Sequence, residues 1–109
     1  MRRNMDLIRA IALGRDTGEY TQEEIEYHVY LMGQAQLALV INSTTAYQGS
    51  PVGILVTLTH EGHDFADLAS DEAWAWAKNL VAKVGGSTTF DMWVWLLKKW
   101  QDYRMEGRL

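Results

Sequence analysis

The amino-acid sequence predicts a mostly helical α+β fold, and three observations support this. Apolar residues recur at helical spacing in five segments, and residues that commonly begin or end helices flank these segments. Two short apolar runs rich in β-branched residues, 37–41 and 53–58, lie close together and predict a hairpin. The chain has 109 residues, is 48% hydrophobic and contains one proline, which is typical of one ordinary globular domain.

The first two predicted helices precede the hairpin. Residues 6–14 place apolar side chains on one stripe and end in a glycine. Thr21 and Glu24 form a capping box, in which the threonine oxygen accepts a first-turn amide and the glutamate reaches back to the cap. We expect the helix that follows to run to about Gln36, with His28 as a hydrogen-bonded residue at the core edge.

Three further helices are expected after the hairpin. The hairpin loop itself, residues 42–52, is long and rich in Ser, Thr, Gly and Pro. Thr59 is positioned to cap the first of these helices and Ser70 the second, whose inward stripe ends with Val84. The last helix is expected to open at Thr88.

Two helices followed directly by a two-stranded hairpin form the arrangement of a winged helix, in which the helix before the wing usually enters the DNA major groove. The sequence therefore predicts a winged-helix-like unit, made of two helices and a β-hairpin wing, followed by three C-terminal helices. We expect a single domain over residues 1–109, with a C-terminal helical extension over about 70–109.

Charge is distributed unevenly along the chain, although the net charge is only −4. Residues 1–15 carry four arginines and one acid, and residues 78–109 carry six basic and three acidic residues. Residues 16–77 carry ten acids and no lysine or arginine, and we call this segment the acidic centre.

The acidic centre has two interpretations. It is either a solvated face whose acids lie at helix starts, or a surface that meets a basic partner protein. In the second case it would regulate or inhibit a protein complex, for example by imitating nucleic acid. Its candidate partner-binding residues are Glu19, Glu23, Glu24, Glu26, Asp64 and Asp67.

DNA binding by a winged-helix transcriptional regulator is the alternative function. Neither the helix at residues 21–36 nor the wing offers a lysine or arginine to phosphates, and the glutamates of the helix would repel them. DNA would have to be contacted by basic residues near the two ends, with candidates Arg2, Arg3, Arg9, Lys98 and Lys99. The local charge therefore favours a protein partner over nucleic acid.

No catalytic chemistry is indicated. The absence of cysteine excludes a disulfide scaffold, a thiolate metal site and a cysteine nucleophile, and no Gly-x-Ser-x-Gly or phosphate-binding glycine loop occurs. His60, His63 and Asp64 share a helix face but lack the zinc-protease spacing, so a third metal ligand would have to be His28 or a distant carboxylate. We expect no enzyme, metal or cofactor, and expect His63 to pack and hydrogen-bond at its helix start.

All five tryptophans fall within residues 74–100. Trp74 lies on the inward stripe of its helix and Trp76 about 200° away, so a straight helix cannot bury both in one core. The last helix is apolar on most sides, which favours contact with a partner unless bent packing buries every tryptophan. We expect Trp76 or Trp95 in an exposed patch or subunit contact, and a homodimer on the C-terminal helices that also involves Trp100.

The chain is expected to be soluble and cytoplasmic. The apolar stretch behind its first residues is broken by Arg9 and Arg15, which argues against a signal peptide. The longest uncharged run, residues 27–60, is interrupted by polar residues and a proline and is not a membrane span.

Four sets of residues form one recognisable pattern: Met1 to Arg9, Glu23-Glu24-Ile25 with Tyr27-His28, Leu58-Thr59 with Glu61-Gly62-His63 and Phe65, and Gly85-Gly86 with Thr89-Phe90-Asp91. They resemble a phage and prophage family classed as domain of unknown function 2513. Gln36 and His60 depart from the pattern, which has glycine and commonly an aromatic residue there. The resemblance implies a winged-helix-like fold and an origin in a mobile element, and it implies no catalytic residues. With such an origin, the partner of the acidic centre would be a host or phage complex, and its inhibition could serve an anti-defence role.

Overall fold

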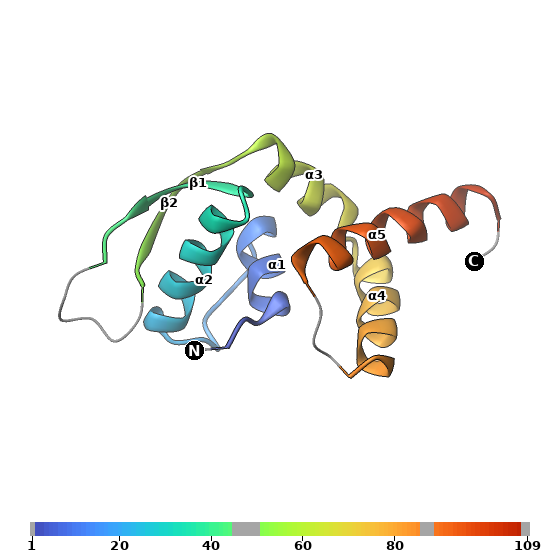
Figure 1. Cartoon of the computed structure of the whole chain (residues 1–109), viewed down its shortest axis with the longest axis horizontal. Helices are drawn as coiled ribbons and strands as arrows, with labels where there is room; N and C mark the ends of the chain where they lie inside the picture. The colour runs from blue at the N-terminus through green and yellow to red at the C-terminus, as the bar shows by residue number, and fades with distance from the viewer. Residues whose placement is uncertain (1, 45–50, 86–88, 108–109) are drawn as a thin grey trace. The chain divides into compact units, whose positions relative to one another are not determined.

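A computed structural model describes residues 2–44, 51–85 and 89–107 of the chain. Within these residues the order is two helices, a two-stranded antiparallel hairpin and three helices, so the predicted mostly helical α+β class is confirmed (Figure 1). The chain divides into two compact units, which we call unit 1 (Met1–Ala66) and unit 2 (Asp67–Leu109).

Helix α1, Met5–Leu13, begins one residue before the predicted range, after a cap at Asn4 that was not predicted, and ends at the predicted glycine. The side-chain oxygen of Asn4 accepts hydrogen bonds from the backbone amides of Asp6 and Leu7, at 3.0 and 3.3 Å. Gly14 ends the helix in the left-handed backbone region, with φ 67°.

Helix α2, Gln22–Gln34, begins with the predicted capping box. The hydroxyl of Thr21 accepts from the Glu24 amide at 3.1 Å, and the Glu24 carboxylate accepts from the Thr21 amide at 3.0 Å. The helix ends two residues before the predicted Gln36, because Gln36 adopts a left-handed backbone with φ 64° that a helix cannot contain.

Strands β1, Ala38–Asn42, and β2, Gly53–Leu58, form the predicted hairpin. A bulge lies opposite the Leu39–Val40 step of β1, which leaves Val56 without a paired residue. The hairpin packs across α2 (Figure 1). Part of the predicted loop, residues 45–50, lies outside the described residues. The winged-helix character of unit 1 stays a prediction.

Helix α3, His60–Leu68, follows the hairpin directly and is capped by Thr59, as predicted. The boundary between the two units falls within this helix.

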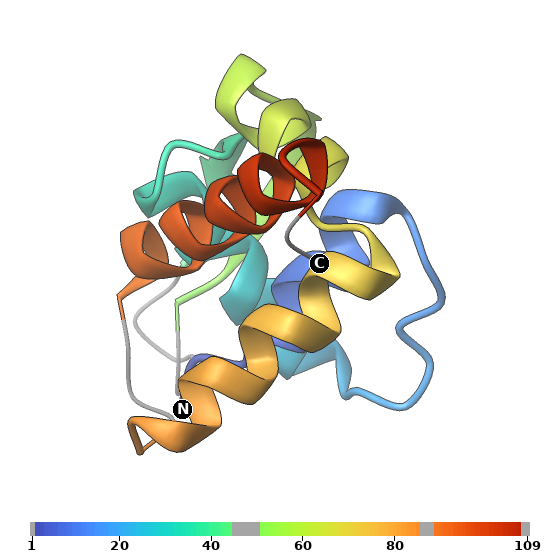
Figure 2. The same ribbon diagram turned by 90° about the vertical axis from the view of Figure 1, so that its right-hand side faces the viewer.

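Unit 2 contains α4, Asp71–Lys83, and α5, Phe90–Met105, which pack against each other (Figure 2). The predicted cap of α4 is confirmed, because the Ser70 hydroxyl accepts from the amide of the third helical residue at 3.2 Å. The predicted start of α5 is wrong by one residue. Its cap is Thr89, whereas Thr88 lies outside the described residues.

The inward position predicted for Val84 is also wrong, since this side chain is 71% exposed. The helical stripe stops with α4 at Lys83, and Val84 no longer follows the helical rotation. Gly85 takes a positive φ of 96°, as expected of a glycine that ends a helix.

Each unit contributes buried apolar side chains. Those of unit 1 include Met5, Leu7, Ile8, Ala12, Val29, Met32, Leu37, Ala38, Val52 and Phe65. Those of unit 2 include Ala69, Ala73, Trp74, Ala77, Val81, Trp93, Leu96 and Leu97.

Candidate protein-interaction surface

Exposed carboxylates lie at the start of α2. Glu19, in the connector before the helix, and Glu23, in its first turn, are both exposed. Glu26 is half-buried and accepts a hydrogen bond from the side-chain amide of Gln22 at 3.1 Å. The positive end of the helix dipole favours acidic side chains in the first turn of α2.

Two side chains beside these acids have shifted pKa values. The Thr21 amide, and then its hydroxyl, lower the pKa of Glu24, whose carboxylate is therefore engaged in the capping box. Partial burial raises the pKa of Tyr20, and the negative charges of Glu19 and Asp6 raise it further. The tyrosine therefore stays neutral within an acidic surface.

The remaining predicted acids lie elsewhere. Asp64 is on α3, where its carboxylate lies 3.5 Å from the Nε2 atom of His60 and both side chains are exposed. Asp67 is exposed and belongs to unit 2. We therefore call only Glu19, Glu23 and Glu26 the acidic surface of unit 1.

His28 is buried and joins α1 to α2. Its Nε2 atom accepts the backbone N–H of Asn4 at 2.8 Å, and its Nδ1 atom lies 2.7 Å from the carbonyl oxygen of Glu24. Since Nε2 accepts, Nδ1 carries the proton and donates it to that carbonyl. The prediction of a hydrogen-bonded histidine at the core edge is confirmed.

Two glycines allow the hairpin to lie close to α2. A Cβ on Gly53 would come within 2.7 Å of the Tyr30 backbone nitrogen and 2.8 Å of Cγ1 of Val40. A Cβ on Gly33 would lie 3.0 Å from Cβ of Val40. This close approach covers the side of the hairpin that carries Val40.

The opposite side of the hairpin is uncovered, and we call it the outer face. It carries Leu39 and Ile41 of β1 and Ile54, Val56 and Thr57 of β2. Every one of these side chains is exposed, the four apolar ones by 51–58%.

The sequence prediction did not include the outer face, although the sequence carried a signal for it. Residues 37–41 and 53–56 are continuous apolar runs and do not alternate between apolar and polar residues. Such runs are typical of strands covered on both sides. A two-stranded hairpin that packs on one helix is covered on one side only.

The tryptophans of unit 2 occupy different environments. Trp74 and Trp93 are buried and stack with ring centroids 4.4 Å apart. Trp76 is half-buried and meets Tyr103 edge to face at 6.1 Å. Trp95 is 54% exposed, as predicted for one of Trp76 and Trp95. Its role in a subunit contact stays a prediction.

The basic residues predicted for DNA contact are divided between the two units. Arg2 and Arg3 are exposed and Arg9 is half-buried in unit 1, where Arg3 and Arg9 already interact with neighbours. In unit 2, Lys98 is exposed and the Lys99 ammonium lies 5.6 Å from the Trp95 ring. Likewise, Arg104 lies 5.2 Å from the ring of the half-buried Trp100.

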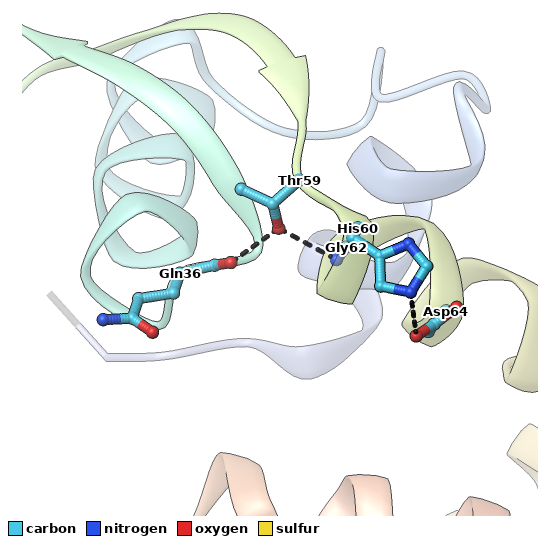
Figure 3. Close-up of polar contacts among 5 residues, drawn as sticks. All are labelled: Gln36, Thr59, His60, Gly62 and Asp64. Atoms are coloured by element: carbon cyan, nitrogen blue, oxygen red, sulfur yellow. Dashed lines mark hydrogen bonds and ion pairs between the residues drawn. The ribbon is translucent and has the colours of Figure 1, made fainter.

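The step from the hairpin into α3 is fixed by Thr59 (Figure 3). Its hydroxyl donates to the carbonyl of Gln36 at 2.6 Å and accepts from the amide of Gly62 at 3.1 Å. Its own amide donates to the carbonyl of Leu37 at 2.9 Å. A Cβ on Gly62 would collide with the same Leu37 carbonyl, so this helix start tolerates only glycine.

A family model described as Hypothetical protein (DUF2513) matches residues 13–87, which is more than half of the chain. The chain belongs to the DUF2513 family. No curated protein and no solved structure matches it. The resembling segments Met1 to Arg9 and Thr89 to Asp91 lie outside the matched residues.

Two features of the DUF2513 resemblance have a structural explanation. Thr59 and Gly62 are the residues that join α3 to the turn after α2. Gln36 stands where the pattern has glycine, and its φ of 64° is one that glycine adopts without strain. These positions therefore fix the local backbone between α2, the hairpin and α3.

The packing role predicted for His63 is wrong. Its side chain is exposed, because α3 turns this position away from the residues that cover Phe65 and Gly62. Within the part of the chain that the structure describes, no three His, Asp or Glu side chains are grouped so that they could hold a metal ion. None of the helices in that part is long and apolar enough to cross a membrane.

Proposed function

We propose that this DUF2513 protein is a non-enzymatic accessory protein of a phage or prophage. It binds and regulates or inhibits a host or phage protein complex through the acidic surface of unit 1, and an anti-defence role is one form of this activity. The supporting observation is that Glu19 and Glu23 are exposed at the start of α2, within a segment that contains no lysine or arginine.

A basic protein surface suits this arrangement. Charges of one sign raise the rate of encounter with an oppositely charged partner and repel partners of the same sign. The helix dipole favours negative charge at the start of α2, and the hydrogen bond from the Gln22 side-chain amide at 3.1 Å orients the Glu26 carboxylate before binding.

The same observations weigh against DNA as the ligand. In a winged helix, α2 and the hairpin would face the duplex, and neither carries a lysine or arginine. Duplex affinity depends largely on neutralising phosphates, which glutamates at the start of α2 would oppose.

Affinity capture from a bacterial host lysate, followed by titration of the captured protein, tests the proposal. We expect the double variant Glu19→Gln/Glu23→Gln to weaken binding at least about tenfold at low salt, with a smaller effect at high salt. The matched control is Asp102→Asn/Glu106→Gln, which removes the same charge from exposed positions of unit 2 and should bind like the wild type.

Titration with duplex DNA supplies the opposing outcome. Micromolar binding that weakens steeply with salt, and that is lost when Arg2 and Arg3 are replaced, would favour the DNA-binding regulator. Equal loss of protein binding in the two double variants would also contradict the role of the acidic surface.

A further inference from the structure

The outer face of the hairpin is apolar, uncharged and open to solvent. Leu39 and Ile41 are each 58% exposed, Ile54 is 51% exposed and Val56 is 53% exposed. No Asp, Glu, Lys or Arg occurs between residues 27 and 60, so no charged side chain belongs to the hairpin itself. Helix α2 packs against the other side of the same hairpin, where Leu55 remains 39% exposed.

The chemistry of this face restricts what can cover it. A charged partner surface would lose its hydration here without gaining a counter-charge, which is unfavourable. A two-stranded hairpin is also marginal in water unless its apolar sides are packed. The matching partner surface is therefore uncharged and apolar over a similar area.

We propose that a second copy of this chain covers the outer face, with the two hairpins packed face to face about a two-fold axis. The four apolar side chains together expose about 400 Å², within the range of the largest apolar patches of monomers. Two copies supply about 800 Å², which matches the apolar share of a specific interface of roughly 1,200–1,600 Å².

Two-fold symmetry suits this face. In such an interface each residue meets the same patch on the partner, so an apolar face without charges is complementary to itself. Two sheets packed in this way form a sandwich about 10 Å thick whose inner side chains interdigitate. The acidic surface of unit 1 is not part of the contact, so the dimer and the proposed function are independent of each other.

Sedimentation equilibrium over a range of concentrations tests the dimer. We expect the wild type to reach twice the monomer mass, and Ile41→Glu to raise the dimer dissociation constant at least about 100-fold, because two unpaired carboxylates would be buried. The matched control is Met105→Glu, which adds the same charge at an 81% exposed position of unit 2 and should dimerise like the wild type.

A second, milder variant distinguishes loss of the dimer from loss of the fold. Ile54→Thr keeps a β-branched side chain in β2 but removes apolar surface, and should raise the dissociation constant about tenfold. Far-ultraviolet circular dichroism and thermal melting would establish that both outer-face variants remain folded.

Three results would overturn the proposal. The first is a wild type that stays monomeric up to millimolar concentration. The second is a folded Ile41→Glu variant that dimerises as well as the wild type. The third is loss of the dimer in Trp95→Ala with no effect of Ile54→Thr, which would place the contact on the C-terminal helices. None of these results affects the test of the acidic surface.

Discussion

The contacts inside unit 1 differ in kind from the contacts inside unit 2. In unit 1, directed hydrogen bonds and close backbone approaches fix the geometry, as at His28, Thr59 and Gly62. In unit 2, two helices pack through aromatic rings, with the Trp74–Trp93 stack among the buried side chains. A contact of the first kind accepts few alternative residues, whereas apolar packing tolerates substitution of similar volume.

The two units also differ in charge. Unit 1 has eight acidic residues against four arginines, and all four arginines precede residue 16. Unit 2 has six of each sign, and two of its cations lie over tryptophan rings. Acidic residues therefore outnumber basic ones two to one in unit 1, whereas the charges of unit 2 balance.

The largest effect is expected at the close approach in unit 1. Gly62→Ala would drive a methyl group into the Leu37 carbonyl, which is backbone and cannot move aside cheaply. We expect the free energy of unfolding to fall by about 4 kcal/mol, measured by urea denaturation. The control is Gly14→Ala, because a methyl group there meets open space and only the positive φ is unfavourable. An equally large loss of unfolding free energy at Gly14 would contradict the importance of the close contact at Gly62.

The stacked rings of unit 2 provide the second test. Trp93→Ala should cost about 3–4 kcal/mol of unfolding free energy, because it leaves a cavity beside Trp74. Trp95→Ala, two residues along the same helix, should cost less than about 1 kcal/mol, because that ring is largely exposed. Equal losses would show that aromatic burial does not decide the stability of this unit.

Removal of the histidine that joins α1 to α2 should have the next largest effect. His28→Ala leaves the Asn4 amide and the Glu24 carbonyl without their partner, and should cost about 2–3 kcal/mol. His63→Ala, at an exposed position, should change stability by less than about 0.5 kcal/mol. Chemical denaturation at neutral pH measures both, and a neutral His28→Ala would contradict the role of this contact.

The capping box should contribute less. Thr21→Ala should cost about 1 kcal/mol of unfolding free energy. Because the pKa of Glu24 is lowered in the folded state, its charge stabilises the protein above the ordinary carboxyl pKa, and this contribution is lost as pH falls through the folded value. Denaturation as a function of pH should therefore show a shallower loss in acid for Glu24→Gln than for the wild type, and parallel curves would refute this.

The smallest effect is expected at the turn after α2, and here the protein should gain stability. Gln36→Gly relieves a positive φ of 64° at the cost of a more flexible unfolded chain, for a net gain of about 0.5 kcal/mol. A rise in the denaturation midpoint with an unchanged slope would confirm it. A fall would mean that the Gln36 side chain contributes more than its backbone strain costs.

Local signals predicted most of the secondary structure. The caps at Thr21, Thr59 and Ser70 act within one helical turn, so the sequence alone was enough to place them. The errors also have local causes. Thr88 and Thr89 are adjacent candidates for one cap, and Val84 lies just beyond the last turn of α4.

The candidate surfaces were predicted less completely. Counting charges along the sequence predicted the acidic residues as a group. Only the structure showed that the Glu24 carboxylate is bound to the Thr21 amide, whereas Glu19 and Glu23 are exposed, and that Asp67 lies in unit 2. The outer face of the hairpin was missed, because a continuous apolar run does not say which of its sides a helix will cover.

By itself, the sequence determined the element order, the helix caps at Thr21, Thr59 and Ser70, the one-signed charge of residues 16–77 and the DUF2513 family. These are properties of neighbouring residues or of composition. Only the tertiary structure decided that His28 meets Asn4, 24 residues away, and that Gly62 meets Leu37. It also decided that Leu39 and Ile41 remain exposed, because such contacts depend on how segments distant in the chain fold over one another.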